Sequence, residues 1–313
     1  MKPLSIGVVG AGAVGGYFGG ILARGGHSVT LIARPAQVEA IVSMGLQIES
    51  ATWQTTVGPP QLTATTDLSS LTTMDGVLLC VKSSDTEAVA AQIGAFLGPD
   101  CWVMSLQNGV DNASRASQVL GRAVIAAVVY VATAAPEPGL VKHFGRGDLI
   151  IGNPAARSFA PHSDGVLQDI ADRFSDAGVP VKVSDAVTHA LWSKLLVNCV
   201  FNALSALSQM DYGTLAAHAP TRQIMQAILD EVLAVAAAAG TPLTPMEAAE
   251  ATEKIIQGMP RQKSSTAQDL ARRKPTEIDH LNGFIAREGL RLGVPTPVNS
   301  TVHGLVKLLE SGF

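Results

Sequence analysis

The first half of the chain alternates short apolar runs with longer segments of helical or turn-rich sequence. Each run is rich in Val, Ile and Leu and is bounded by Gly, Asp, Pro or polar residues, which is typical of buried strands. The predicted strands cover residues 4–9, 29–32, 76–81, 102–106, 124–131 and 179–183. Near-continuous apolar strands separated by helix-length segments favour a mostly parallel sheet with both faces covered. Residues 136–152, which contain Pro-Gly and Gly-Arg-Gly, predict a hairpin-like appendage.

Long Ala- and Leu-rich helical patterns replace this alternation near Ser184. The predicted helices cover residues 185–209, 221–239, 245–258, 266–273, 276–292 and 297–310. The pattern therefore predicts an α/β domain with a mostly parallel sheet at residues 1–184, followed by an all-α domain at residues 185–313. A cleft between two such domains is the usual place for a small-molecule site.

Composition places the chain among globular proteins. Hydrophobic residues make up 47 % and charged residues 15 % of the 313 residues, which argues against disorder. The net charge of −4 gives no broad attraction to nucleic acid or to an anionic membrane. Three widely spaced cysteines without a CxxC motif predict the free thiols of a cytoplasmic protein. No signal peptide is expected, and the longest uncharged stretch, residues 195–210, is too short to span a bilayer comfortably.

A glycine-rich sequence, GAGAVG, lies between the first predicted strand and a predicted helix at residues 14–24. It fits the GxGxxG pattern of dinucleotide-binding turns, and this strand–turn–helix context makes the match specific. The glycines would allow a tight turn, approach of the backbone to a pyrophosphate, and close packing of helix on strand. The alternative is that they only make a tight turn. The expected cofactor contacts are Gly10, Gly12, Ala13, Val14 and Gly15.

The second predicted strand ends at Ile32-Ala33-Arg34. Enzymes that use NAD commonly carry an Asp or Glu near this point, which binds the ribose hydroxyls. No acid stands at this strand end, and an arginine there suits the 2′-phosphate of NADPH through bidentate pairing. The alternative is that Arg34 is a solvated surface charge.

Three polar residues follow a helical spacing in an otherwise very apolar segment. Lys194, Asn198 and Asn202 are four residues apart, which places them on one stripe of one helix. Buried lysine and asparagine side chains need partners, so a stripe that faces a ligand would explain the pattern. A lysine ammonium near a ketone can polarise the carbonyl and deliver a proton. The alternative is that the stripe is the solvent face of the helix.

Two further polar residues lie near the C-terminus. Ser265 and Gln268 match a capping box, and Glu277, just after Pro275, matches a first-turn acid favoured by the helix dipole. On spacing alone both Ser265 and Glu277 have structural explanations. A serine at a helix start can nevertheless bind a substrate carboxylate together with the local N–H groups.

The other candidate chemistry is weaker. The seven histidines are scattered without an HExxH or paired helical spacing, so no metal site is predicted. His143 in the predicted hairpin and His189, which lies off the lysine stripe, are interpreted as structural. No GxSxG or P-loop sequence is present, which removes serine hydrolase and kinase functions.

Taken together, these sequences resemble the ketopantoate reductases (2-dehydropantoate 2-reductases) over nearly the whole chain. The shared motifs are GAGAVGGYFGG at 10–20, LIAR at 31–34, VK at 81–82, LQNGV at 106–110, PGLVKHFGRGDLIIG at 138–152, WSKLLVNCVFNAL at 192–204, SSTAQDLARRKPTEIDHLNGF at 264–284 and GVPTPVN at 293–299. The resemblance implies an N-terminal Rossmann domain that binds NADP and a helical domain that binds substrate. It also implies NADPH-dependent reduction of 2-dehydropantoate to pantoate, a step toward pantothenate and coenzyme A.

The resemblance further implies a role for each candidate residue. Arg34 would take the 2′-phosphate, Lys82 would lie near the cofactor, and Asn108 would lie beside the nicotinamide ribose and the substrate. Lys194 would be the general acid, and Glu277 would join the proton network around it. Substrate contacts would come from Asn198, Asn202 and Ser265.

One position departs from the family pattern. Some members carry an asparagine in a Pro-Asn-Gly-Glu-Leu turn after the lysine helix, where this chain has Tyr212. The departure leaves the exact 2-oxo acid open, because relatives reduce other branched or aromatic 2-oxo acids. A third alternative is a redox sensor that binds NADPH without turnover. Exposed apolar faces on the helical domain would permit a homodimer.

Overall fold

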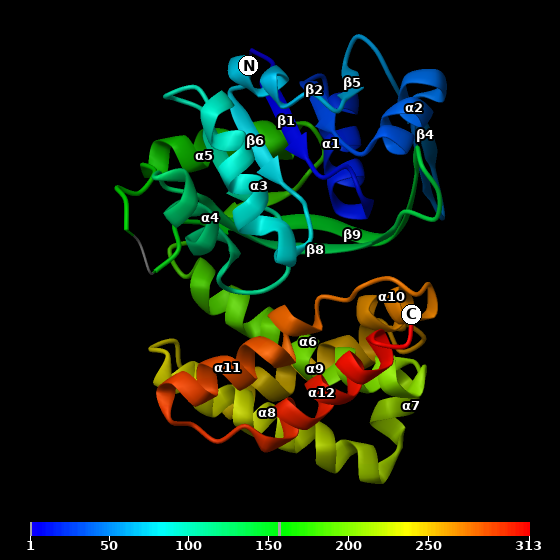
Figure 1. The fold of residues 1–313 in the computed structure, drawn as a ribbon, viewed down its shortest axis with the longest axis vertical. Coiled ribbons are helices and arrows are strands. Elements are labelled where there is room, and N and C mark those ends of the chain that lie inside the picture. Colours follow the sequence, from blue (N-terminus) through cyan, green and yellow to red (C-terminus); the bar gives the residue numbers. More distant parts are fainter. Residues whose placement is uncertain (1, 156–157) are drawn as a thin grey trace. The chain divides into compact units, whose positions relative to one another are not determined.

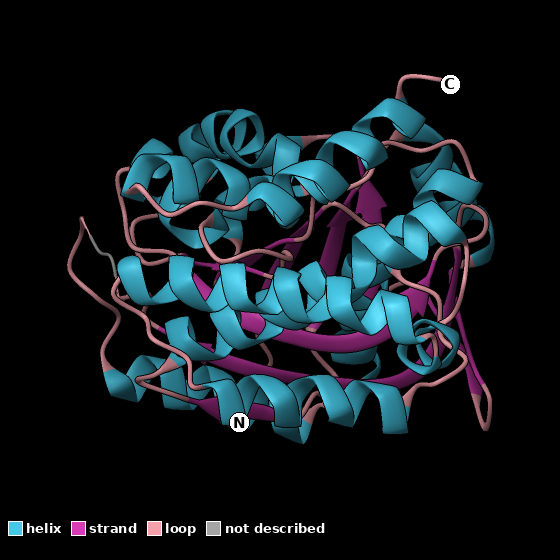
Figure 2. Cartoon of the chain, turned by 90° about the horizontal axis from the view of Figure 1, so that it is seen from below, coloured by secondary structure: helices cyan, strands magenta, loops and turns pink. Residues whose placement is uncertain are grey.

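The computed structural model describes residues 2–155 and 158–313 of the chain. The chain divides into two compact units, Met1–Val187 and Thr188–Phe313. The first unit holds the strands that the structure describes, and the second is built from helices joined by loops (Figures 1 and 2).

A largely parallel sheet forms the centre of the first unit. In the described residues its strand order is β4-β3-β9-β8-β7-β6-β1-β2-β5, and β10 pairs with β9. Two pairs, β3–β4 and β8–β9, are antiparallel. The strands are β1 (Ser5–Val9), β2 (Ser28–Ile32), β3 (Leu46–Ser50), β4 (Gln54–Val57), β5 (Leu62–Thr65), β6 (Gly76–Leu79), β7 (Trp102–Ser105), β8 (Ile125–Ala134), β9 (Leu140–Gly152) and β10 (Val181–Val183).

Burial explains why these segments are strands. All residues of β6 and β7 are buried, as expected for central strands with apolar contacts on both faces. The helices that connect the strands are α1 (Ala13–Arg24), α2 (Pro35–Met44), α3 (Thr86–Ile93), α4 (Asn112–Leu120) and α5 (Asp164–Asp176). Helix α1 presents several glycines to the sheet, and a Cβ at Gly20 would lie 2.5 Å from Ile48 Cδ1. The glycine-rich sequence of α1 therefore allows close packing of helix on sheet.

The hairpin predicted at residues 136–152 is confirmed in part, because β8 and β9 are antiparallel and joined by a turn at Pro138-Gly139, but the prediction of an appendage is wrong. Strand β9 is 13 residues long and lies inside the sheet, antiparallel to β8 and parallel to β3 and β10. The Gly-Arg-Gly sequence is not a turn, because it lies where the β8–β9 register shifts. Gly145 and Gly147 adopt φ values of 151° and 144°, and a Cβ at Gly147 would lie 2.2 Å from the Tyr17 hydroxyl. The glycines thus accommodate irregular strand geometry and close packing.

Helices make up the second unit. They are α6 (Val187–Ser208, whose first residue belongs to the first unit), α7 (Tyr212–Ala217), α8 (Ala219–Ala238), α9 (Pro245–Gly258), α10 (Ser265–Ala271), α11 (Asn282–Leu292) and α12 (Pro297–Glu310). By length and composition alone, α6 could cross a membrane, but 67 % of its most apolar window is buried within the protein. Helix α6 is therefore mostly covered by the rest of the protein.

The predicted single helix at residues 276–292 is also wrong. A 3₁₀ turn at Ile278–His280 precedes α11, and Leu281 between them has non-helical angles (φ −115°, ψ −105°). The reason is competition by side chains of α12. The carboxylate of Glu310 accepts hydrogen bonds from the backbone N–H and the hydroxyl of Thr276, and Asp279 pairs with Lys307 at 2.9 Å. These contacts hold the segment in a bend that a continuous helix could not adopt.

Candidate active site

The glycine turn follows β1 and has two constrained positions and one open position. Gly10 has φ +99°, and a Cβ there would lie 2.8 Å from the backbone carbon of Cys80. A Cβ at Gly15 would lie 2.2 Å from the carbonyl oxygen of Gly10. A Cβ at Gly12, in contrast, would meet nothing within 4 Å. The fold itself requires glycine at 10 and 15, whereas glycine at 12 leaves space for an external group to reach the backbone.

The N-terminus of α1 is suited to an anion. Gly12 is its exposed N-cap, so no side chain caps the helix, and its first turn contains no acid. The first N–H groups of a helix lack partners within the helix and carry the positive end of the dipole. Together with the open space at Gly12, this geometry fits a pyrophosphate.

Arg34 lies at the same edge of the sheet as the glycine turn. Strands β1 and β2 are parallel and in register, and the N–H of Gly10 donates to the carbonyl of Ile32 at 3.0 Å. Arg34 is the exposed N-cap of α2, whose first turn contains no acid. Within the described part of the chain, its guanidinium has no ion-pair partner. The fold thus places an exposed cation at the strand end where dinucleotide-binding folds contact the adenosine ribose.

Lys82 and Asn108 follow the next two strands at this edge. Strand β1 lies between β2 and β6, which is the point where the sheet order reverses and where dinucleotides bind in such folds. Lys82 comes after β6 and is the half-buried N-cap of a 3₁₀ turn, Ser83–Asp85. Asn108 comes after β7 and is half-buried. The four segments that carry the predicted cofactor residues therefore share the carboxyl edge of one sheet.

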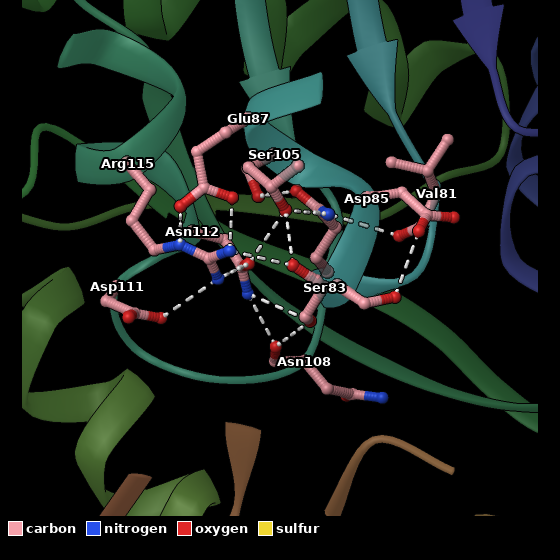
Figure 3. Close-up of polar contacts among 12 residues, drawn as sticks. Val81, Ser83, Asp85, Glu87, Ser105, Asn108, Asp111, Asn112 and Arg115 are labelled. Atoms are coloured by element: carbon pink, nitrogen blue, oxygen red, sulfur yellow. Dashed lines mark hydrogen bonds and ion pairs between the residues drawn. The ribbon is translucent and has the colours of Figure 1, made fainter. Parts of the chain in front are cut away.

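Buried polar residues behind Lys82 and Asn108 were missed by the sequence reasoning. The backbone carbonyl of Asn108 accepts hydrogen bonds from the Ser83 hydroxyl at 2.9 Å and from Asn112 Nδ2 at 2.6 Å (Figure 3). Gln107 Nε2 donates to the carbonyl of Val81 at 3.1 Å, which joins the ends of the two strands. A signal was present, because the shared LQNGV motif continues directly into Asp111 and Asn112.

The lysine stripe lies on α6, and its residues become more buried along the helix. Lys194 and Asn198 are half-buried, and Asn202 is only 4 % exposed. In the part of the chain that the structure describes, the side-chain amides of Asn198 and Asn202 have no hydrogen-bond partner. The amide atoms of these two residues are not among the fully buried atoms that lack partners, so they stay accessible to water or to a bound polar molecule. The solvent-face alternative does not fit a residue as buried as Asn202.

The predicted capping box at Ser265 is wrong by one residue. Ser264 is the N-cap of α10, and its hydroxyl accepts from the N–H of Ala267 at 3.0 Å. The same hydroxyl donates to the carbonyl of Asn202 at 3.2 Å, and the N–H of Ser264 donates to Ser205 Oγ at 3.2 Å. These buried serines dock the start of α10 on α6, beside Asn202. The hydroxyl of Ser265 is left exposed next to the stripe, without a hydrogen-bond partner among the described residues.

Glu277 is not in the first turn of a long helix, as the spacing predicted. It is the half-buried N-cap of the 3₁₀ turn that precedes α11. Its neighbours Thr276 and Asp279 are bonded to α12, so the turn that carries Glu277 is held in place from both sides. A short 3₁₀ turn therefore supports the helix-dipole explanation for the acid at position 277 less than a long helix would.

Tyr212 packs beside the stripe. Its ring lies 4.8 Å from that of Phe201, which is seven residues after Lys194 and so on the same face of α6. The N–H of Tyr212 donates to the carbonyl of Gln262 at 3.0 Å, which ties the start of α7 to the segment before α10. Burial raises the pKa of Tyr212 to about 12, so its phenol stays protonated at neutral pH.

The two histidines singled out in the sequence each contact another side chain of the protein. His143 is buried and stacks on Tyr17 with ring centroids 4.5 Å apart. His189 is partly exposed and faces Glu247 at 3.5 Å. Among the described residues, no group of three His, Cys, Asp or Glu side chains is arranged to hold a metal ion.

The fold and these residues define a class. The strand order of the sheet reverses at a glycine turn, and the helical unit carries a stripe of one lysine and two asparagines. Together these features are typical of a pyridine-nucleotide oxidoreductase built from two units. Two family models match the chain: "Ketopantoate reductase PanE/ApbA" over residues 6–156 and "Ketopantoate reductase PanE/ApbA C terminal" over residues 186–310. The chain belongs to the ketopantoate reductase family.

Individual relatives agree with this assignment. A PanE/ApbA family ketopantoate reductase from Ralstonia eutropha JMP134 is 46 % identical in sequence, with a TM-score of 0.90 and 99 % of both chains covered. The 2-dehydropantoate 2-reductase of Halobacterium salinarum is 31 % identical, over 97 % of this chain and 98 % of the relative. A ternary structure of D-mandelate dehydrogenase with NADH and anilino(oxo)acetate is 25 % identical, with a TM-score of 0.89 and 99 % of both chains covered.

Proposed function

We propose that this protein reduces 2-dehydropantoate to pantoate with NADPH as the electron donor. The observation that carries the proposal is the stripe on α6, where a lysine shares one helical face with two amides that lack hydrogen-bond partners in the described chain. Full-length similarity to 2-dehydropantoate 2-reductases supports the substrate. The product would enter the synthesis of pantothenate and coenzyme A.

The residues of the first unit fit the cofactor. The backbone from Gly10 to Gly15, including Ala13 and Val14, would hold the pyrophosphate at the N-terminus of α1. Arg34 would bind the 2′-phosphate, and Lys82 and Asn108 would contact the nicotinamide half. When bound, the cofactor supplies a hydride to the C2 atom of the substrate.

The residues of the second unit would handle the substrate and the proton. The ammonium of Lys194 polarises the 2-oxo group and donates its proton to that oxygen as negative charge develops there. The amides of Asn198 and Asn202 bind polar groups of the substrate, and the hydroxyl of Ser265 binds its carboxylate. The carboxylate of Glu277 stabilises the charged lysine, whose ammonium must be protonated again before the next cycle.

The direct test follows NADPH absorbance with purified protein and 2-dehydropantoate. We expect consumption of NADPH that depends on both protein and substrate. No consumption with 2-dehydropantoate, together with turnover of another 2-oxo acid, would contradict the proposed substrate but keep the reaction class.

The cofactor needs a separate test, because D-mandelate dehydrogenase, a structural neighbour, was solved with NADH. We expect Arg34→Ala to lower kcat/KM for NADPH by about tenfold or more, since it removes a charged pair with phosphate. The value for NADH, which lacks the 2′-phosphate, should change little. An unchanged ratio between the two cofactors would remove Arg34 from this role.

A second candidate substrate class is favoured by Tyr212. Its ring, packed on Phe201, replaces an amide that some relatives place at this turn, and it offers an apolar face with a protonated phenol. An aromatic or branched 2-oxo acid would suit such a surface. Comparing kcat/KM for 2-dehydropantoate with values for phenylglyoxylate and 2-oxoisovalerate decides between the two classes.

The compartment is part of the proposal. The three cysteines, Cys80, Cys101 and Cys199, are unpaired, and burial raises the pKa of each thiol. Free, unreactive thiols suit a reducing environment, and we propose that the protein works in the cytoplasm.

A further inference from the structure

A polar cluster with a buried centre lies next to the loops that follow β6 and β7. Figure 3 shows its contacts, which include those of Ser83, Glu87, Asn108, Asn112 and Arg115. The loop after β6 carries Lys82 and the loop after β7 carries Asn108, so the cluster lies next to both. The 3₁₀ turn, α3 and α4 supply most of its side chains.

Asn112 is the centre of the cluster, and all of its hydrogen-bonding capacity is used. It is 3 % exposed. Its Nδ2 donates to the carbonyl of Asn108 at 2.6 Å and to the hydroxyl of Ser83 at 3.2 Å. Its Oδ1 accepts from the hydroxyl of Thr86 at 3.0 Å and from Arg115 Nη1 at 3.2 Å. One amide therefore joins both loops to two helices.

Arg115 and Glu87 close the cluster on its outer side. Arg115 Nε donates to Glu87 Oε1 at 2.6 Å, and Nη2 donates to the second carboxylate oxygen, which makes the pair bidentate. Nη2 also donates to the backbone carbonyl of Ser83 at 3.0 Å. The guanidinium, fixed by Glu87, thus holds both the loop after β6 and the Asn112 amide.

The cluster fixes backbone atoms of Asn108 rather than its side chain. The carbonyl of Asn108 points into the cluster, while its side-chain amide points away from it (Figure 3). The next residue, Gly109, has φ +107°, so the chain turns sharply immediately after the fixed carbonyl. A fixed carbonyl followed by a tight turn sets the direction in which the Asn108 side chain leaves the backbone.

We propose that Asn112, Arg115 and Glu87 are positioning residues that set the geometry of Asn108 and Lys82 for cofactor binding and hydride transfer. The inference rests on the proposed function, because it takes Asn108 and Lys82 as cofactor contacts. None of the three positioning residues needs to touch the cofactor or the substrate. They act through the two loops, so their substitution should change the Kd for NADPH and kcat/KM. Substitution of a residue that only stabilises the fold should change Tm alone.

The chain offers a matched control arginine. Arg122 donates to the carbonyls of Gly98, Cys101 and Pro99 at 2.9, 3.0 and 3.1 Å, beside the start of β7 and so at the opposite edge of the sheet. Arg115→Met and Arg122→Met each remove a guanidinium that holds backbone carbonyls. Of the two arginines, only Arg115 belongs to the cluster that holds the loops carrying Lys82 and Asn108.

The experiment measures Tm, the Kd for NADPH by calorimetry, and kcat and KM for Arg115→Met, Arg122→Met and Asn112→Asp. The aspartate keeps the shape and the contact with Arg115 but loses both Nδ2 donors. We expect Arg115→Met and Asn112→Asp to raise the Kd for NADPH and lower kcat/KM by about tenfold or more. Arg122→Met should lower Tm by a similar amount to Arg115→Met and leave both binding and kcat/KM near wild type.

Equal effects of the two arginine variants on kcat/KM and Kd would overturn the proposal, as would wild-type kinetics in Asn112→Asp. Should Arg115→Met or Asn112→Asp fail to fold, Glu87→Gln replaces it, since Glu87 is 47 % exposed and the amide keeps its shape. The same Kd shift is expected there, smaller in size, and its absence counts against the proposal. Failure of the proposed function would appear separately, as a wild-type protein that binds NADPH without reducing 2-dehydropantoate.

Discussion

Two asparagine sites, one in each unit, differ in how their side-chain amides are bonded. In the first unit, Asn112 uses both donors and both acceptors of its amide within the protein. In the second unit, the amides of Asn198 and Asn202 have no partner among the described residues, although Asn202 is almost fully buried. A fully bonded cluster gives a rigid scaffold, whereas amides without protein partners are available to a ligand. We infer that the cluster around Asn112 is preorganised and that the substrate supplies the partners of the Asn198 and Asn202 amides.

The largest expected effect separates chemistry from cofactor binding. Lys194→Ala removes the proposed general acid, and we expect kcat to fall by about 10²–10⁴-fold, the range typical of such groups. The Kd for NADPH, measured by calorimetry, should stay close to wild type, because the predicted cofactor contacts lie in the first unit. Substantial turnover in the variant would show that another group delivers the proton.

The glycine turn allows stability to be separated from binding within a single motif. Gly15→Ala places a Cβ 2.2 Å from the Gly10 carbonyl oxygen, so we expect a clear loss of Tm. Gly12→Ala places its Cβ in open space, so Tm should hold while the Kd for NADPH rises by about tenfold or more. Should Gly12→Ala bind NADPH as tightly as wild type, the pyrophosphate would not lie at this turn.

The sequence was most informative where the functional residues form a regular pattern over a short stretch of the chain. The strand–glycine turn–helix sequence predicted β1 and α1, and the i, i+4, i+8 spacing predicted one face of α6. Sequence was least informative where the structure depends on distant partners. Ser264 rather than Ser265 caps α10 because Asn202 and Ser205, some 60 residues away, bind it. No local rule distinguishes the two adjacent serines.

The errors in the fold have the same origin. The Gly-Arg-Gly sequence in β9 has turn composition, but pairing with β8 and β3 makes the segment a strand. Strands β3, β4 and β5 are short and rich in Thr, Gln and Glu, so no apolar run marked them. The bend before α11 depends on Glu310 and Lys307 of another helix. Tertiary contacts override local preference in each case.

A pair of neighbouring residues on α6 tests the contrast between satisfied and unsatisfied groups. Asn202→Ala removes an amide without a partner, so we expect little change in stability and a rise of about tenfold or more in KM for the 2-oxo acid. Ser205→Ala removes a buried hydroxyl that bonds the carbonyl of Met210 and the N–H of Ser264. It should cost about 1–3 kcal/mol of stability. If Asn202→Ala were the more destabilising variant, the amide would have a structural role.

The smallest effect concerns the ion-pair network that holds the turn carrying Glu277. Burial alone would raise the pKa of Asp279, but hydrogen bonds from His303 and Lys307 hold it below its usual value. Burial also opposes ionisation of Glu310, yet Lys307 and Thr276 lower its pKa. Lowered carboxyl pKa values stabilise the fold above about pH 4 and lose that contribution as pH falls through the folded values.

Lys307→Met should therefore destabilise the protein by about 0.5–1 kcal/mol at pH 7, a small value because the ammonium is partly exposed. The difference from wild type should shrink below about pH 4, as both carboxyl groups become protonated. Urea unfolding at several pH values measures this, with Lys254→Met on α9 as the control for loss of an exposed lysine. A difference that persisted unchanged at low pH would mean that Lys307 stabilises α12 by packing of its alkyl chain, and that the turn of Glu277 is held without its charge.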